Sequence, residues 1–431
     1  MMTDPIKAHG KEANETDEAI GRERTAWERI DAIDTDESKA YFSRELLIWY
    51  DRSKRDLPWR RHRDPYFIWV SEIMLQQTRV DTVIPYFHRF IERFPTIREL
   101  AEAPQEDVVK MWEGLGYYSR ARNLQAAAQQ IVELHDGQMP SEREHVFALK
   151  GVGPYTAGAI LSIAFNRPEP AVDGNVMRVL SRYFLIEDDI AKPKTRIGME
   201  KIIPGLIPEG RASDFNQALM ELGALICTPK SPHCLICPVM EHCRGRIEGM
   251  ERDLPVKTKA KKPRPEQRLA VLLEGAGERE GRVLVRRRPR TGLLAGMWEL
   301  PHIAADSAPE AQDLGLEVGQ LEELLEDLGL SWSPMSPYMT AEHTFSHIHW
   351  TMRVLTAREQ PEVLAQLAAE SGVPYEVAVP EAAAEALEAD EAGTGAEVEW
   401  RWIAEADMRE IAFPNLFLNI LNRYFGEAKQ S

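Results

Sequence analysis

All four cysteines of this 431-residue chain lie in one stretch, residues 227–243. They are Cys227, Cys234, Cys237 and Cys243, with gaps of six, two and five residues. Four thiolates in one short loop can hold a tetrahedral zinc ion or a cubane [4Fe–4S] cluster. Zinc modules typically present two close pairs joined by a longer loop, whereas these cysteines form a single compact group. We therefore favour an iron–sulfur loop, with structural zinc and unligated core cysteines as the alternatives.

Hydrophobic periodicity divides the chain into distinct domains. Residues 41–250 contain amphipathic segments of helical period, such as "VDTVIPYFHRFIERF", with no alternating strand pattern, which predicts an all-α domain. Residues 251–267 are basic and aperiodic and contain proline, as expected of a linker. In residues 268–425, "RLAVLLEG", "GRVLVRRR", "HWTMRVLT" and "AEVEWRW" read as strands, while "VGQLEELLEDLG" and "ADMREIAF" read as helices, so this domain should be α+β. Residues 1–40 are expected to form a disordered acidic tail.

The charge is distributed unevenly along the chain. The net charge of −17 argues against a nucleic-acid partner, but residues 41–266 hold 33 basic and 30 acidic side chains, a net +3. Residues 267–431 hold 13 basic and 28 acidic side chains. Because phosphate binding depends on the local field, the central domain remains compatible with DNA. No apolar run approaches a membrane span, and residues 1–40 contain no apolar block or cleavage site, so we expect neither membrane insertion nor export.

A Gly-Val-Gly-Pro turn in "LKGVGPYTAGAI", residues 149–160, separates two segments of helical pattern. Together with the cysteine spacing, this turn resembles the helix-hairpin-helix DNA glycosylases that carry a [4Fe–4S] loop. The resemblance implies that the backbone at Gly151 and Gly153 holds a DNA phosphate, with a monovalent cation or calcium bound at the hairpin. An ordinary helix–helix turn is the simpler alternative. The cysteine loop would also present basic residues to DNA, unless these only solvate the loop: Lys230, His233, Arg244 and Arg246.

Tyr155 directly follows the hairpin. Bifunctional relatives that excise oxidised pyrimidines carry a lysine at this position, which attacks the sugar as an amine and then cleaves the strand. Tyrosine cannot form a Schiff base, so the resemblance implies a monofunctional glycosylase that leaves an abasic site. "SEIMLQQTRV" and "AVDGNVMRVL" narrow the resemblance to the MutY-type adenine DNA glycosylases, which excise adenine mispaired with 8-oxoguanine or guanine. The implied partner is double-stranded DNA with such a mispair, bound by a monomer in the cytoplasm at the nucleoid.

Two carboxylates suit the cleavage of an N-glycosidic bond, which needs a proton on the leaving purine and support for a cationic sugar. Glu72 lies in the mostly apolar "IWVSEIMLQQT", where burial would raise a carboxyl pKa, so we expect it to be the general acid. A carboxylate on a solvated helix face is the alternative. Asp173 precedes a helical segment, as a helix cap does. The resemblance adds a role below the anomeric carbon, as ion partner or transient nucleophile. It also implies that Asn175 positions Asp173 or a water and that Tyr155 hydrogen-bonds to Asp173.

The resemblance also assigns residues to extrusion of the adenine, which costs a few kcal/mol. Gln77 and Tyr117 are expected to enter the duplex beside the 8-oxoguanine, and Thr78 to contact that base. Arg60 is expected to reach into the adenine pocket, with Leu75 near its wall. A role in the core is the alternative for each of the five.

The segment "RVLVRRRPRTGLLAGMWELP" resembles the strand and loop of Nudix hydrolases. A working Nudix enzyme needs a helix with clustered glutamates for magnesium, and "EVGQLEELLEDLG" lacks that pattern at the right distance, so we expect a binding-only domain. Within it, Phe345, Ser346 and His347 match the loop with which the family reads 8-oxoguanine. A metal site formed by the histidines of "HTFSHIHW" is the alternative. Because this domain is strongly acidic, we expect its DNA-facing surface either to hold arginines, such as those of the stretch 286–290, or to contact fewer phosphates.

Two other functions fit parts of the sequence. One is a bifunctional glycosylase and lyase acting on pyrimidine lesions, which Tyr155 and the second domain oppose. The other is a non-catalytic DNA-binding or redox-sensing iron–sulfur protein, for which Glu72 would have no chemical role.

Overall fold

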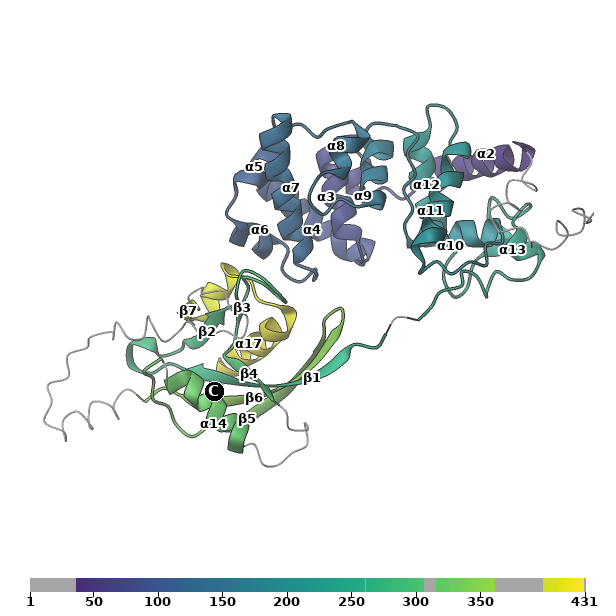
Figure 1. Cartoon of the computed structure of the whole chain (residues 1–431). Helices are drawn as coiled ribbons and strands as arrows, with labels where there is room; N and C mark the ends of the chain where they lie inside the picture. Colours follow the sequence, from purple (N-terminus) through teal and green to yellow (C-terminus); the bar gives the residue numbers. More distant parts are fainter. Residues whose placement is uncertain (1–35, 260, 306–314, 327, 361–397, 430–431) are drawn as a thin grey trace, which may run out of the picture. The chain divides into compact units, whose positions relative to one another are not determined.

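The computed structural model describes residues 36–259, 261–305, 315–326, 328–360 and 398–429 (Figure 1). Of the expected acidic tail, residues 1–35 lie outside this description, and the last five residues begin helix α2 (Asp36–Ser53). The chain forms two compact units. The first combines residues up to Asp56 with Pro154–Thr258, and the second combines Leu57–Gly153 with the chain from Lys259 onward. Among the described residues, no helix has both the length and the apolar character needed to cross a membrane.

The described residues of the first unit form helices and turns and no β-strand. Its helices are α2, α9 (Pro154–Ala159), α10 (Gly174–Tyr183), α11 (Pro193–Ile202), α12 (Ala212–Leu225) and α13 (Arg244–Ile247), with the π-helical η2 (Ile160–Ala164) continuing α9 and the 3-10 turns η3 (Ile203–Gly205) and η4 (Cys234–Ile236). Phe42 of α2 packs against Tyr183 and Phe215, and all three rings are buried. Apolar side chains from α2, α10 and α12 thus form the core of this unit.

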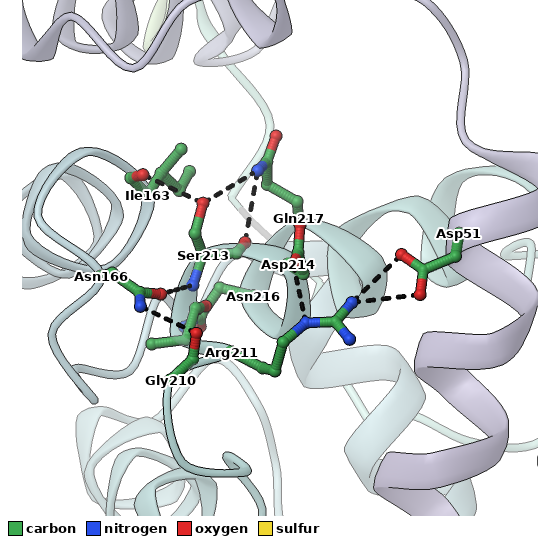
Figure 2. Close-up of polar contacts among 10 residues, drawn as sticks. Asp51, Ile163, Asn166, Gly210, Arg211, Ser213, Asp214, Asn216 and Gln217 are labelled. Carbon is green, nitrogen blue, oxygen red and sulfur yellow. Dashed lines mark hydrogen bonds and ion pairs between the residues drawn. The ribbon is translucent and has the colours of Figure 1, made fainter.

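The first turn of α12 is connected to two other segments of the first unit (Figure 2). Arg211 donates from Nη2 to both carboxylate oxygens of Asp51 in α2, each at 3.1 Å. Ser213 donates from its backbone N–H to Asn166 Oδ1 at 3.0 Å and from Oγ to the Ile163 carbonyl at 3.0 Å. These bonds fix α12 against α2 and against the end of η2.

The second unit begins with a helical part. It comprises η1 (Pro58–Arg60), α3 (Pro65–Leu75), α4 (Val80–Arg93), α5 (Ile97–Glu102), α6 (Gln105–Met111), α7 (Ser119–His135) and α8 (Arg143–Phe147). Asp64 caps α3 by accepting the Tyr66 N–H at 2.8 Å, and Pro65 occupies the first helical position. Trp69 is fully buried, and most other side chains of α3 are buried as well. A helix that is apolar on nearly every side belongs in a core, and α3 lies there.

The rest of the second unit has the expected α+β fold. The strands are β1 (Arg264–Glu274), β2 (Val283–Arg287), β3 (Trp298–Glu299), β4 (His302–Ala305), β5 (Ser336–Thr344), β6 (Ile348–Arg358) and β7 (Trp400–Ile403). The sheet order is β3-β2-β1-β6-β5, with β4 paired to β1 and β7 to β2, and only the β1–β6 pair is parallel among the described strands. Alternate residues of β1 face different cores, so Leu272 packs with Phe417 of α17 (Asn415–Ala428), while Val271 packs with Leu321 of α14 (Gly315–Glu326).

Two segments differ from the sequence-based expectations. Strand β1 starts at Arg264, inside the expected linker, because its parallel pairing with β6 runs from Arg264 opposite Ile348. The segment "ADMREIAF" was expected to be a helix but forms the 3-10 turn η6 (Glu405–Arg409) followed by irregular chain. Pro414 follows this segment, and the residue before a proline is disfavoured in helical conformation.

Candidate active site and DNA-binding residues

Glu72 lies in the buried helix α3 of the second unit. Its exposed fraction is 5%, and its neighbours Ile73 and Met74 are also buried. The carboxyl group therefore does not lie on a solvated helix face. Leu75, the last residue of α3, is partly exposed, so the accessible end of the helix follows Glu72 by one turn.

Asp173 is the N-cap of α10 in the first unit. Its Oδ1 accepts the Val176 N–H at 2.7 Å, and its Oδ2 accepts a hydrogen bond from Asn175 Nδ2 at 2.9 Å. The cap and the contact with Asn175 are therefore both present. Burial raises the pKa of Asp173, although these two hydrogen bonds and the nearby Arg178 act in the opposite direction. The carboxyl group is held by both oxygens and is harder to ionise than an ordinary aspartate.

The segment before Asp173 is fixed by α12 and α9. Asn216 of α12, fully buried, accepts the Ala171 N–H on Oδ1 at 3.0 Å. Gly158 of α9 lies against the same segment, and a Cβ built at this glycine would come within 1.9 Å of the Pro170 carbonyl oxygen. Glycine is thus required where the helix and this segment approach each other.

Arg178 links the hydrogen bonds of Asp173 to the cysteine loop. Its Nη2 donates to Asn175 Oδ1 at 2.8 Å and to the Gly223 carbonyl at 2.8 Å. Its Nε donates to the Cys227 carbonyl at 2.7 Å. The side chain is buried, so a continuous series of hydrogen bonds runs through the interior from Asp173 to the first cysteine.

The four cysteines line one pocket. None of the four forms a disulfide. Burial, reinforced by the neighbouring thiols, raises the pKa of Cys237 to about 12 and that of Cys243 to about 11. The guanidinium of Arg182, almost fully buried, donates to Cys227 Sγ at 3.3 Å. Thiols whose pKa is raised in this way ionise only when a cationic centre binds them, so the donor set fits a metal cofactor.

The two glycines of the expected phosphate-binding turn differ in the space around them. Gly151 has a φ of 74°, and a Cβ there would lie 2.7 Å from Asn123 Cβ, so the fold itself requires glycine. At Gly153 a Cβ would meet no heavy atom of the described residues within 4 Å. Both glycines are exposed, and the Val152 N–H closes the turn on the Leu149 carbonyl at 3.1 Å. The open space at Gly153 suits the close approach of a ligand to the backbone.

Gln77 and Tyr117 both adopt the left-handed backbone conformation, with φ values of 57° and 50°. This conformation is uncommon for residues with a side chain and often marks functional positions. Gln77 is exposed, and the exposed fraction of Tyr117 is 44%. Thr78 and Arg60 are partly exposed, so four of the five residues assigned to extrusion or base contact reach solvent outside helix α3.

Arg120 holds the two left-handed positions together. Its Nη1 donates to the Ile73 and Gln76 carbonyls at 2.8 and 2.6 Å, at the end of α3. Its Nη2 donates to the Gly116 carbonyl at 3.1 Å, and the guanidinium lies 5.5 Å from the ring centre of Tyr117. Burial lowers the pKa of Arg120 to about 10, so the side chain remains a cation at neutral pH.

The residues Phe345, Ser346 and His347, called here the reading loop, form the turn between β5 and β6. The ring of Phe345 packs 5.0 Å from that of Trp350, which anchors the turn. Ser346 and His347 are exposed, with Ser346 Oγ 3.1 Å from His347 Nδ1. A cavity of about 410 Å³ is lined by the reading loop, by Tyr117 with its neighbours, and by residues 292–294 and 414–415. The structure thus brings together two motifs that are far apart in the sequence.

Sequence comparisons match the domains one by one. Residues 70–205 match the HhH-GPD superfamily base excision DNA repair protein, residues 227–243 the iron-sulfur binding domain of endonuclease III, and residues 275–423 the NUDIX domain. The adenine DNA glycosylase of Rattus norvegicus is 38% identical over 362 residues, which cover 73% of this chain and 69% of the relative. The chain belongs to the adenine DNA glycosylase family.

Two further proteins are similar to this chain. The adenine DNA glycosylase of Schizosaccharomyces pombe is 35% identical, over 75% of this chain and 83% of its own length. A solved thermostable thymine-DNA glycosylase aligns with 49% of this chain and 98% of its own, at 29% identity and a TM-score of 0.46. As an adenine DNA glycosylase, the chain is an enzyme of base excision repair, and its cysteine loop binds an iron–sulfur cluster.

The arginines expected to face DNA have other partners in the glycosylase. Arg286 and Arg288 donate to the buried carboxylate of Glu299 at 2.9 and 2.7 Å. Burial alone would raise the pKa of Glu299, but the adjacent histidine and these two arginines hold it well below its usual range. Arg287 pairs with Glu106 and Glu399. These three arginines neutralise carboxylates of the protein itself, which favours the alternative that this domain contacts fewer phosphates.

Sequence reasoning missed two arginines of this adenine DNA glycosylase, the half-buried Arg120 and the buried Arg178. Both lie on amphipathic helices, where an arginine ordinarily belongs to the solvated face. For Arg178 the available signal was its spacing, because it follows Asn175 by three residues and both therefore lie on one face of α10. Arg120 had no such signal, since Tyr117 precedes α7. Among the described residues, the histidines of "HTFSHIHW" belong to no group of three or more His, Cys, Asp or Glu side chains that could hold a metal ion.

Proposed function

We propose that this glycosylase is monofunctional and hydrolyses the N-glycosidic bond of adenine mispaired with 8-oxoguanine, or with guanine, leaving an abasic site. The observation that carries the proposal is the shared cavity of Tyr117 and the reading loop. Tyr117 supplies an exposed ring that can stack beside a base. Ser346 and His347 supply donors and acceptors that can recognise the altered edge of an oxidised purine. Extrusion of one base and inspection of its partner thus draw on residues around one cavity.

The chemistry divides between two carboxyl groups. Glu72 protonates the imidazole-ring nitrogen of adenine, so the base leaves as a neutral purine when its bond to the anomeric carbon breaks. The carboxylate of Asp173 stabilises the positive charge that develops on the sugar. A water molecule then attacks the anomeric carbon. The proton that this water releases restores the acid form of Glu72. The bond from Asn175 keeps the Asp173 carboxylate in a fixed orientation.

The proposal of monofunctional chemistry rests on Tyr155. A phenol cannot form the Schiff base that strand cleavage by an amine requires. The Tyr155 hydroxyl lies 3.5 Å from Met220 Sδ. We propose in addition that the Tyr155 hydroxyl forms a hydrogen bond with Asp173.

The cofactor proposed for the cysteine loop is a [4Fe–4S] cluster. The spacing of Cys227, Cys234, Cys237 and Cys243 and the pocket that all four line support this proposal. When bound, the cluster joins the four thiolates and so cross-links the loop. Basic residues of the loop contact phosphates of duplex DNA: Lys230, His233, Arg244 and Arg246. The protein binds the duplex as a monomer. A monovalent cation or calcium is bound at the Gly151–Gly153 turn.

A single-turnover base-release assay tests the proposal. Duplexes with adenine opposite 8-oxoguanine, guanine or thymine are incubated with excess protein, and half of each sample receives hot alkali. We expect rapid release opposite 8-oxoguanine, slower release opposite guanine, and strand breaks only after alkali. Glu72→Gln should slow release by about a hundredfold or more, because a proton donor is lost. Breaks without alkali would indicate a lyase, and a parent and a Glu72→Gln variant that both bind the duplex without releasing adenine would indicate a binding protein.

A further inference from the structure

An ion pair connects two parts of the second unit: the part that contains strands β1 to β7, called here the sheet domain, and the segment that carries Tyr117. This segment, residues 112–118, lies between α6 and α7 and is called here the Tyr117 loop. Lys110, at the end of α6, pairs with Glu113 and donates from Nζ to the carbonyls of Met408 and Ile411 at 2.7 and 3.0 Å. Glu113 Oε1 accepts the Phe413 N–H at 2.8 Å. One charged pair therefore binds three backbone groups of the sheet domain.

The surroundings of the pair make a purely stabilising role a poor explanation. The side chains of Lys110 and Glu113 are only 17% and 14% exposed. All three ammonium protons of Lys110 have an acceptor, and each carboxylate oxygen of Glu113 has a donor. A largely buried ion pair contributes little stability relative to apolar residues of the same size. Fully paired charges fix geometry instead.

Phe413 is the point at which the Tyr117 loop and the core beneath the reading loop meet. Its backbone N–H binds Glu113, and its carbonyl oxygen accepts a hydrogen bond from Tyr118 at 3.4 Å. Its side chain is fully buried in the same core as Trp350, and Trp350 packs against Phe345 of the reading loop. The next two residues, 414 and 415, line the shared cavity. Contacts thus run without interruption from the reading loop to the Tyr117 loop.

We propose that Lys110 and Glu113 are positioning residues that couple recognition of the base opposite adenine to base extrusion by the Tyr117 loop. This inference rests on the proposed function. Contacts of the reading loop with 8-oxoguanine fix the sheet domain, and the ion pair transmits that placement to Tyr117. Without the pair, the enzyme still extrudes and cleaves adenine, but the identity of the opposite base no longer changes the rate.

The test compares single-turnover base release opposite 8-oxoguanine and opposite guanine. Glu113→Gln keeps the size of the side chain and an acceptor for Phe413, but it removes the charge and directs an amide at Lys110. We expect release opposite 8-oxoguanine to slow by about tenfold, equivalent to about 1.4 kcal/mol. Release opposite guanine should stay within about twofold of the parent, so the ratio of the two rates falls. Lys110→Met should give the same ratio, and the double variant should lose no more than either single variant.

Glu106→Gln is the matched control. It removes an exposed carboxylate that pairs with Arg287 of the sheet domain but makes no bond to the Tyr117 loop. Exposed pairs contribute little energy, so this variant should keep the parental ratio.

The possible outcomes separate the inference from the proposed function. A parent protein with equal rates opposite 8-oxoguanine and guanine overturns both. A parent with a clear preference, together with Glu113→Gln and Lys110→Met variants that keep it, overturns the coupling alone. The coupling is also overturned if both rates fall in parallel with the thermal midpoint, because a structural defect does not distinguish the two duplexes. If Glu113→Gln does not fold, Lys110→Met decides the question.

Discussion

Replacing Arg178 by glutamine removes four hydrogen bonds from the interior of the first unit, of which the one to the Gly174 carbonyl is long at 3.4 Å. The acceptors of the three short bonds are the carbonyls of Gly223 and Cys227 and the side-chain oxygen of Asn175. A buried acceptor left without a donor costs about 1 kcal/mol at the lower bound, so we expect the free energy of unfolding to fall by about 3 kcal/mol.

The effect on catalysis follows from the amide of Asn175. Arg178 binds the amide oxygen, which leaves the amide nitrogen to donate to Asp173. Without Arg178, the amide can rotate by half a turn and direct its oxygen at the carboxylate, which repels it. Loss of a residue that orients a catalytic group typically costs about 10- to 100-fold in activity, so we expect single-turnover base release to slow by about that factor.

The assay compares Arg178→Gln with Arg44→Gln, which removes an exposed arginine paired with Glu45 on the surface of α2. Both proteins are first checked for the visible absorbance of the iron–sulfur cluster and for their urea midpoint. A cluster-loaded Arg178→Gln variant that releases adenine within twofold of the parental rate would refute the reasoning. So would an equal loss in Arg44→Gln.

Three more predictions concern the same unit. The raised pKa of Asp173 means that, as pH falls, its carboxylate becomes protonated at a higher pH than an ordinary aspartate would, and the activity should be lost there. Asn175→Ala removes a hydrogen bond that lowers this pKa, so it should move the acid limb of the pH–rate profile to still higher pH. Gly158→Ala should lower the free energy of unfolding by about 1–3 kcal/mol in urea titrations, since its Cβ would lie 1.9 Å from the Pro170 carbonyl oxygen. Cys237→Ser should abolish most of the cluster absorbance near neutral pH and lower the thermal midpoint, whereas unchanged spectra would exclude Cys237 as a ligand.

The sequence was most informative where function depends on local order along the chain. The spacing of the cysteines, the cap at Asp173 and the turn at Gly151 each involve residues close in sequence, and the structure shows the pocket, the cap bond and the positive φ. The apolar neighbours of Glu72 likewise predicted its burial.

Long-range partners could not be predicted in this way. Arg286 and Arg288 look basic and available in the sequence, but in the fold both donate to the buried carboxylate of Glu299. The pairing of Lys110 with backbone carbonyls some 300 residues later has no sequence signature, because every residue offers the same carbonyl group. Side-chain types predict local chemistry, whereas the identity of a distant backbone partner depends on the complete fold.

The left-handed backbone at Gln77 and Tyr117 is already present in the protein alone. For an L-residue this conformation costs about 1 kcal/mol or more, so imposing it at both positions during binding would take about 2 kcal/mol, roughly thirtyfold in affinity for DNA. Folding supplies this energy in advance, so that in the proposed complex the duplex would meet a backbone already set at both positions.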